Sequence, residues 1–348
     1  MTLLTFIYFV LILGVIILIH EFGHFIFAKK SGIYVYEFSI GMGPRIFKWT
    51  RKNDETEYSI RLIPIGGFVQ MAGEEIEDDP EVPKDKKFSV KTFGQKFMTV
   101  IAGIMNNFIL AIVLFFIIAL FTGAPQNKAL VGEISEDYPA YTSGLKTGDR
   151  ILKLNGKDAS TYDTLALQLQ VNTGEKVKLE VERNGETKTI TLTPKKVKED
   201  GEEVYRYGFA ITDEVETGFF ASLKYAFSKT FSLVHQMILI ITYLITGNLN
   251  LTALSGPVGI FGIVGTAASS GIWSLLSLTA LLSVNVGFIN LLPIPAFDGG
   301  RLLFIIIEKI KGKPVDPKLE NTIHSIGFFL LMALMLLITY NDIIRLIK

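Results

Sequence analysis

The 348-residue sequence contains no cysteine, and it has only four histidines and two tryptophans. Without cysteine, neither a disulfide bond nor a thiolate metal site is possible. Histidines and carboxylates are therefore the only strong ligands left for a zinc ion. The formal net charge is zero, so nothing in the electrostatics points to a nucleic-acid partner, and we expect none.

Charge is missing from four long segments, which contain no Asp, Glu, Lys or Arg: residues 2–19, 97–127, 230–297 and 321–341. A membrane-spanning helix needs about 20 mainly apolar residues, and each segment is long enough to hold one. The chain is 49% hydrophobic with a mean hydropathy of +0.40. We predict a polytopic α-helical membrane protein with about four transmembrane helices.

Two regions between these segments have strand signals: residues 124–212, and an apolar stretch at 58–71 within the mixed loop at 29–96. Residues 124–212 have the turn and strand signals of a small β-rich domain, including two alternating strands joined by Asn184-Gly185, a strong two-residue hairpin signal. Residues 58–71 also alternate like a strand, with Tyr58, Ile60 and Leu62 on one face. Because this stretch lies between two expected spans, we interpret it as a re-entrant β-hairpin region that dips back toward the membrane.

The first apolar segment runs directly into the motif HEFGH at residues 20–24. On a helix, His20 and His24 share one face and can bind a single zinc ion, with Glu21 placed to take a proton from a water molecule. Ionisable groups inside a membrane are costly unless they have a partner or a use. The alternative, two core histidines with a partnered glutamate, leaves that cost unexplained.

Two histidines make an incomplete catalytic zinc site, which normally has three protein ligands and one open position. The downstream candidates are His235, His324 and Asp298. Asp298 is the strongest, because it ends the third long apolar segment, where an unpaired carboxylate would be expensive. Pro293 and Pro295 break the helix just before it. The alternative role for Asp298 is a helix cap at the membrane surface.

Three features together resemble the site-2 protease family of intramembrane zinc metalloproteases (peptidase M50), most closely the bacterial RseP/RasP type with one PDZ domain. They are HExxH in the first span, NxxPxPxxDGG at 290–300, and between them residues 139–156, which look like part of a PDZ domain. FSIGMGP at 38–44, GGFVQMAGE at 66–74 and SGPVGI at 255–260 match as well. The similarity covers nearly the whole chain.

The resemblance implies one zinc ion per chain, held by His20, His24 and Asp298, with Glu21 as the catalytic base. Asn107 matches the asparagine of the family's second-span motif, although Ile104 stands where that motif usually has proline. By the same resemblance, the residues that contact substrate are Asn290, Asn107, Gly66, Gly67, Phe68, Pro293 and Pro295.

The expected organisation follows the chain. It is span 1 at 1–28, a cytoplasmic loop at 29–96 with the re-entrant β region at 58–71, span 2 at 97–122, the PDZ domain at 124–212, surface amphipathic helices and the GPVGI segment at 217–270, span 3 at 272–300, a basic cytoplasmic loop at 301–320, and span 4 at 321–343. Two additional spans within 217–270 would preserve the direction of span 3 and are the alternative. Lys and Arg near the span ends place the loops inside and the PDZ domain outside the cell membrane.

The expected function is hydrolysis of peptide bonds within or next to transmembrane segments of membrane proteins. The family implies single-span substrates of type II orientation, such as anti-sigma factors or remnant signal peptides, already shortened by an upstream site-1 protease. The main alternative is a membrane-anchored PDZ receptor with a non-catalytic zinc site. A transporter is a third idea, but the chain lacks the internal repeat of many such folds.

Overall fold

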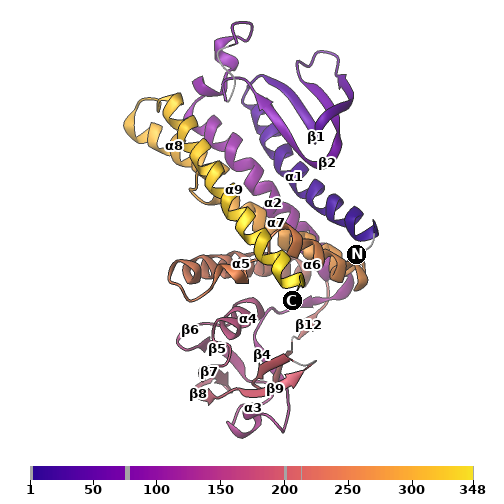
Figure 1. Cartoon of the computed structure of the whole chain (residues 1–348), viewed down its shortest axis with the longest axis vertical. Coiled ribbons are helices and arrows are strands. Elements are labelled where there is room, and N and C mark those ends of the chain that lie inside the picture. The colour runs from indigo at the N-terminus through magenta and orange to yellow at the C-terminus, as the bar shows by residue number, and fades with distance from the viewer. Residues whose placement is uncertain (1–2, 75–78, 200–201, 213, 348) are drawn as a thin grey trace. The chain divides into compact units, whose positions relative to one another are not determined.

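The computed structural model describes residues 3–74, 79–199, 202–212 and 214–347. The chain divides into two compact units (Figure 1). The first comprises Met1–Leu114 and Thr252–Lys348, and the second comprises Phe115–Leu251. Two stretches far apart in the sequence therefore fold together around one interior.

Helices dominate the first unit. In chain order they are α1 (Leu3–Lys30), the short 3₁₀ helices η1 (Lys84–Lys86) and η2 (Phe88–Val90), α2 (Phe93–Thr122, whose end from Phe115 belongs to the second unit), η3 (Leu251–Ala253, which continues from the second unit), α6 (Pro257–Ser269), α7 (Ile272–Leu291), α8 (Asp298–Lys311) and α9 (Pro317–Ile347). Ile16 of α1 and Val264 of α6 are completely buried in one apolar cluster with Leu278 of α7. This packing holds α1 against the C-terminal half of the chain.

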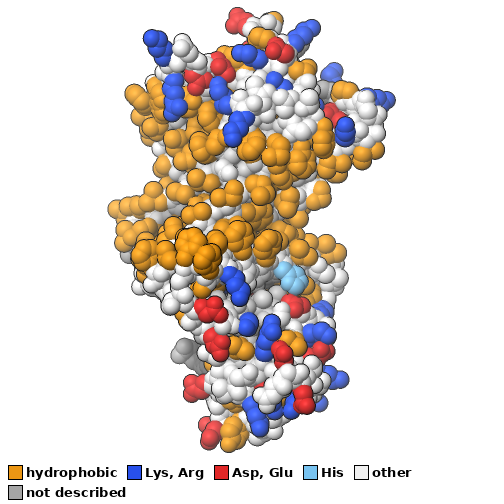
Figure 2. All heavy atoms as spheres, turned by 180° about the vertical axis from the view of Figure 1, so that it is seen from behind, with side chains coloured by type: hydrophobic (Ala, Val, Ile, Leu, Met, Phe, Trp, Pro, Cys, Tyr) orange, Lys and Arg blue, Asp and Glu red, His pale blue; other side chains and the backbone are white. Residues whose placement is uncertain are grey.

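Six helical segments in the described part of the chain are long and apolar enough to cross a membrane. They are Leu3–Lys30, Phe93–Thr122, Phe219–Ile245, Leu251–Ser269, Ile272–Leu291 and Lys318–Arg345. Figure 2 shows hydrophobic side chains covering much of the helical surface, with few charged side chains among them. A multi-pass membrane protein is the class that fits this distribution, because helices apolar on all faces are stable in lipid.

A hairpin of two long strands, β1 (Val35–Thr50) and β2 (Glu57–Met71), follows α1. Residues 37–40 of β1 pair with 67–70 of β2 on one side and with 57–60 of β2 on the other. Among the residues that the structure describes, 67–71 have a paired strand on one side only, so the far end of β2 presents an open edge. The three side chains expected to share a face differ in exposure, since Tyr58 is 7% exposed while Ile60 and Leu62 are 40% and 61% exposed.

The second unit contains a six-stranded sheet in the order β11-β4-β5-β7-β8, with β6 paired to β5. Its elements are β3 (Ala124–Pro125), β4 (Leu130–Ile134), α3 (Pro139–Thr142), β5 (Arg150–Leu154), β6 (Lys157–Asp158), α4 (Tyr162–Val171), β7 (Val177–Arg183), β8 (Glu186–Leu192), β9 (Lys195–Glu199), β10 (Glu202–Arg206), β11 (Phe209–Thr212), β12 (Val215–Glu216) and α5 (Phe219–Ile245). The predicted Asn184-Gly185 hairpin is confirmed, because β7 and β8 pair across these two positive-φ residues.

Helix α5 packs along α4 of this unit through polar side chains. Lys229 Nζ lies 2.6 Å from Asp163 Oδ1, and Ser232 Oγ donates to Asp163 Oδ2 at 2.9 Å. Three turns further on, the Tyr243 hydroxyl donates to Gln168 Oε1 at 2.9 Å in a buried contact. One face of α5 is therefore held by a small β-rich domain along much of its length.

The region after Asp298 differs from the expectation of a loop at 301–320. Most of it is helix α8, which ends at Lys311 and is followed by Gly312 in the left-handed conformation. Lys309 and Lys311 occupy the last turn, where positive charge is favoured by the helix dipole. The basic residues of this segment thus lie largely on a helix, and span 3 as expected at 272–300 is interrupted between α7 and α8.

Candidate metal centre

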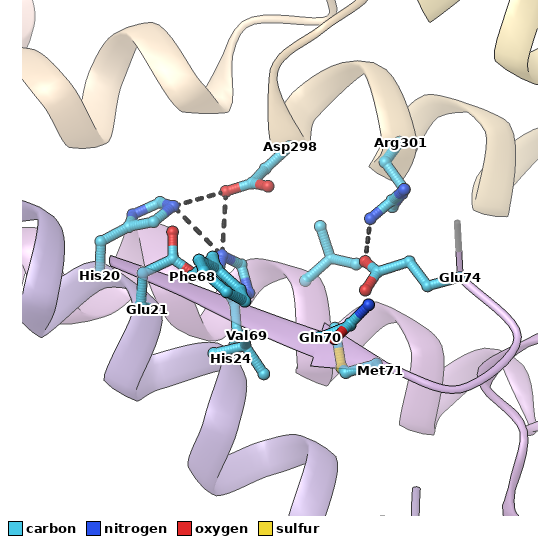
Figure 3. Close-up of a pocket in the computed structure, with 11 residues that line it drawn as sticks. His20, Glu21, His24, Phe68, Val69, Gln70, Met71, Glu74, Asp298 and Arg301 are labelled. Atoms are coloured by element: carbon cyan, nitrogen blue, oxygen red, sulfur yellow. Dashed lines mark hydrogen bonds and ion pairs between the residues drawn. The ribbon is translucent and has the colours of Figure 1, made fainter. Parts of the chain in front are cut away.

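His20 and His24 of α1 meet Asp298, the first residue of α8, in the first unit (Figure 3). Asp298 Oδ2 lies 2.9 Å from His20 Nε2 and 3.3 Å from His24 Nε2. The two Nε2 atoms are 3.1 Å apart. Three potential ligand atoms from distant parts of the sequence therefore converge on one point.

Their spacing and chemistry fit a zinc ion. His24 Nδ1 lies 2.9 Å from the Thr99 carbonyl oxygen, so Nδ1 carries the proton and Nε2 presents a lone pair. Asp298 Oδ2 presents another, and two lone pairs facing one point repel each other unless a cation lies between them. Ligands bound tetrahedrally to zinc at about 2.0–2.1 Å are roughly 3.3 Å apart, close to the separations here.

Helix α2 fixes His24 by a close approach. A methyl group added at Gly103 would lie 2.3 Å from His24 Nε2 and 2.6 Å from its Cε1. Only glycine lets α2 pass this near the imidazole, and the same turn of α2 brings the Thr99 carbonyl to Nδ1. The glycine of the AGIMNNF segment is thus explained by the imidazole of His24 that it faces.

The two asparagines of AGIMNNF both contact α1 from the same side of α2. Asn106 Nδ2 donates to the Ile19 carbonyl at 3.0 Å, and the Asn107 side-chain amide lies 3.1 Å from His20 Nδ1. Asn107 is 0% exposed. It has no accessible surface for a substrate to touch, contrary to the expectation that it contacts substrate, because it lies behind the His20 ring.

A pocket of about 350 Å³ opens on the three converging residues. Its described lining is His20, Glu21, His24, Phe68, Val69, Gln70, Met71, Glu74, Val100, Asp298 and Arg301. Glu21 thus faces the same space as the ligand atoms, and residues 68–71 of β2 line that space as well (Figure 3). The open edge of β2 therefore points into this pocket.

Other residues expected to contact substrate lie around this pocket in different ways. Phe68 is in the lining, while Gly66 and Gly67 are buried where β2 passes α1. Asn290 is half-buried in the last turn of α7. Asn290, Pro293 and Pro295 are outside the pocket's described lining. In this structure, only part of the expected substrate-contact set is brought together.

The two alternative third ligands lie elsewhere. His324 Nδ1 accepts a hydrogen bond from the Ala296 backbone N–H at 3.0 Å. It therefore supports the loop that precedes Asp298, in which Ala296 has a positive φ of 79°. His235 belongs to the second unit, where its Nδ1 lies 3.7 Å from Asp158.

An ion pair between Glu74 and Arg301 at the pocket rim was not expected from the sequence. It connects the segment after β2 to α8, one turn beyond Asp298 (Figure 3). The available signal was positional: Glu74 ends GGFVQMAGE, and Arg301 follows the DGG that contains Asp298. Charged residues adjoining two matched motifs were good candidates for contact with each other.

Comparison with known proteins agrees with this geometry. Residues 8–334 match the model of Peptidase family M50. The chain is 35% identical to zinc metalloprotease RasP of Geobacillus kaustophilus, over 98% of each protein. It is 32% identical to zinc metalloprotease RasP of Oceanobacillus iheyensis, over 97% of this chain and 98% of that one. A family match across most of the chain, together with full-length similarity to these relatives, shows that this protein belongs to peptidase family M50.

Proposed function

We propose that this protein is an intramembrane zinc endopeptidase of the site-2 type. The observation that carries the proposal is that Asp298 of α8 meets His20 and His24 beside Glu21. The two histidines and Glu21 lie on α1, a helix long and apolar enough to span a membrane. A cluster that is costly in lipid requires a function, and a catalytic metal with an adjacent base supplies one.

In this proposal His20, His24 and Asp298 hold the zinc ion. Zinc, when bound, polarises the substrate carbonyl and makes a nearby water easier to ionise. Glu21 takes the proton of the attacking water and passes it to the nitrogen of the leaving amine, acting first as base and then as acid. Its side chain lines the pocket together with His20, His24 and Asp298.

The substrates we propose are single-span membrane proteins of type II orientation. A helical substrate hides its backbone in its own hydrogen bonds, and unwinding it in lipid frees groups that need partners. The open edge of β2 at residues 67–71 supports such pairing, because residues 68–71 line the pocket that Glu21 also lines. We also propose that a longer substrate segment contacts Asn290, Pro293 and Pro295.

We further propose four spans, formed by α1, α2, α7 and α9. Helix α6 has 13 residues, or about 20 Å, which is short for a hydrocarbon core of about 30 Å. Helix α5 is long enough, but its polar contacts with α4 run from Lys229 to Tyr243. Turns held by a water-soluble domain are not free to lie across lipid, so we assign α5 to the membrane surface.

The proposed PDZ domain is residues 124–212, located outside the cell membrane, with the metal centre near the cytoplasmic side. A pocket of about 560 Å³ between α4 and the edge strand β11 supports the PDZ assignment, since extended peptides bind PDZ domains by adding a strand at a sheet edge. The proposed role is to admit membrane proteins already trimmed by an upstream site-1 protease. Anti-sigma factors and remnant signal peptides are the substrate types we propose.

The deciding experiment uses the purified full chain and a panel of single-span reporters in both orientations. Wild type should cleave reporters whose N-terminus is inside, while Glu21→Gln should keep its zinc and lose cleavage. Asp298→Ala should lose both zinc and cleavage. Cleavage by both wild type and Glu21→Gln would remove Glu21 as the base. Bound zinc without any cleavage would favour the alternative, a PDZ receptor with a non-catalytic zinc site.

A further inference from the structure

In each metal-facing histidine, a hydrogen-bond partner must determine whether the second ring nitrogen carries the proton. His20 and His24 have different partners at this nitrogen. A neutral imidazole carries one proton, so a ring that offers Nε2 to a metal must keep its proton on Nδ1 and donate it there. His24 does so toward the Thr99 carbonyl. His20 faces the side chain of Asn107 instead.

The orientation of the Asn107 amide is the informative detail. Its Nδ2 lies 3.1 Å from His20 Nδ1, and an amide NH₂ only donates, so in this arrangement Nδ1 is the acceptor. The His20 proton is then on Nε2, which is 2.9 Å from Asp298 Oδ2. This arrangement satisfies His20 without a metal, and for Nε2 to bind one the proton must be on Nδ1 instead.

Rotating the Asn107 amide by 180° exchanges its nitrogen and oxygen, so that the oxygen faces His20 Nδ1. Asn107 Oδ1 is buried, and within the described residues it has no hydrogen-bond partner. After rotation, this oxygen faces His20 Nδ1 and accepts its proton, which leaves the Nε2 lone pair for zinc. The amide can therefore match either tautomer of His20.

We propose that Asn107 is a positioning residue for the zinc site: its side-chain oxygen accepts the His20 Nδ1–H when zinc is bound, fixing the tautomer and angle of that ring. This inference rests on the proposed zinc site and replaces the expected role of Asn107 in substrate contact. It also accounts for a fully buried asparagine on a long apolar helix, where an unpaired amide would be costly.

The test compares zinc affinity of the detergent-solubilised full chain in wild type, Asn107→Ala, Asn107→Asp and Asn106→Ala. Competition with a chelator measures affinity, and the visible spectrum of Co²⁺-loaded protein reports ligand geometry without any need for activity. Loss of an outer partner of a metal-binding histidine typically costs about 10- to 100-fold in metal affinity. We expect that loss in Asn107→Ala.

The other two variants show whether the lost zinc affinity of Asn107→Ala comes from the missing hydrogen-bond acceptor or from looser packing of α2 on α1. Asn107→Asp keeps an acceptor and removes the donor, so it should bind zinc within a few-fold of wild type or more tightly. Asn106→Ala removes an equivalent contact between α2 and α1 that touches no ligand, and should leave zinc affinity unchanged. The proposal is overturned if Asn107→Asp loses zinc as Asn107→Ala does, or if Asn106→Ala loses as much zinc affinity as Asn107→Ala. Wild type failing to bind zinc would instead reject the proposed function.

Discussion

Replacing Gly103 with alanine tests the close approach of α2 to the metal centre. The added methyl would lie 2.3 Å from His24 Nε2 and 2.8 Å from Cδ2, whereas ordinary heavy-atom contacts lie at about 3.5–4.0 Å. The ring or the helix must therefore move by more than about 1 Å. Zinc–ligand distances hold to about 0.2 Å, so a displacement of this size removes His24 from its ligand position.

The magnitude follows from the cost of overpacking. Inserting a methyl into a closely packed interior typically costs about 1–3 kcal/mol. If that strain is relieved in the metal-free state by moving His24, the same energy is lost from zinc binding, a decrease of about 5- to 150-fold in affinity. Peptide cleavage should fall in parallel, because fewer molecules hold zinc at a given concentration.

The assay is chelator competition for zinc on the purified full chain, combined with reporter cleavage. Gly94→Ala is the matched control: it lies on the same helix, and nothing is within 4 Å of the added methyl. It should leave zinc affinity unchanged. Wild-type zinc affinity in Gly103→Ala would refute the reasoning, since it would mean that α2 does not press against His24 in the folded protein.

Three further predictions concern other contacts. Removing zinc with a chelator should abolish cleavage, and adding zinc back should restore it; a thermal unfolding midpoint that stays constant with zinc concentration would contradict binding to the native state. Glu74→Gln should reduce kcat/KM by about 2- to 10-fold, because it weakens a partly exposed ion pair that anchors α8 beside the pocket; an unchanged value would show that the pair has no influence on the site. Burial disfavours the charged form of Asp149, but hydrogen bonds from Arg183 and the Lys146 backbone outweigh this and lower its pKa. Its stabilising contribution should therefore be present above the ordinary pKa of about 3.9 and be lost as the pH falls through the lower folded value. Asp149→Ala should cost about 1–3 kcal/mol at neutral pH and remove this acid sensitivity, as denaturant unfolding at several pH values would reveal.

Local patterns were enough for much of the site. The spacing of His20 and His24 places both on one helix face wherever that helix packs. The cost of an unpaired carboxylate in lipid singled out Asp298, although nothing in the sequence states which residues it meets. The Asn184-Gly185 turn was equally readable, because two consecutive positive-φ positions favour these residue types.

Tertiary packing decided the rest, because it depends on which faces of distant elements meet. The rotation of α2 against α1 decides whether Asn107 faces a substrate or a histidine. A helix that is apolar on all sides carries no periodic sequence signal of that rotation. The same holds for the open edge of β2 beside Glu21, and for the polar contacts that tie α5 to α4. The sequence by itself determined which side chains can bind a metal and move a proton. The fold alone determined what surrounds them, since the contacts that orient His20 and His24 come from a helix more than 70 residues away in the chain.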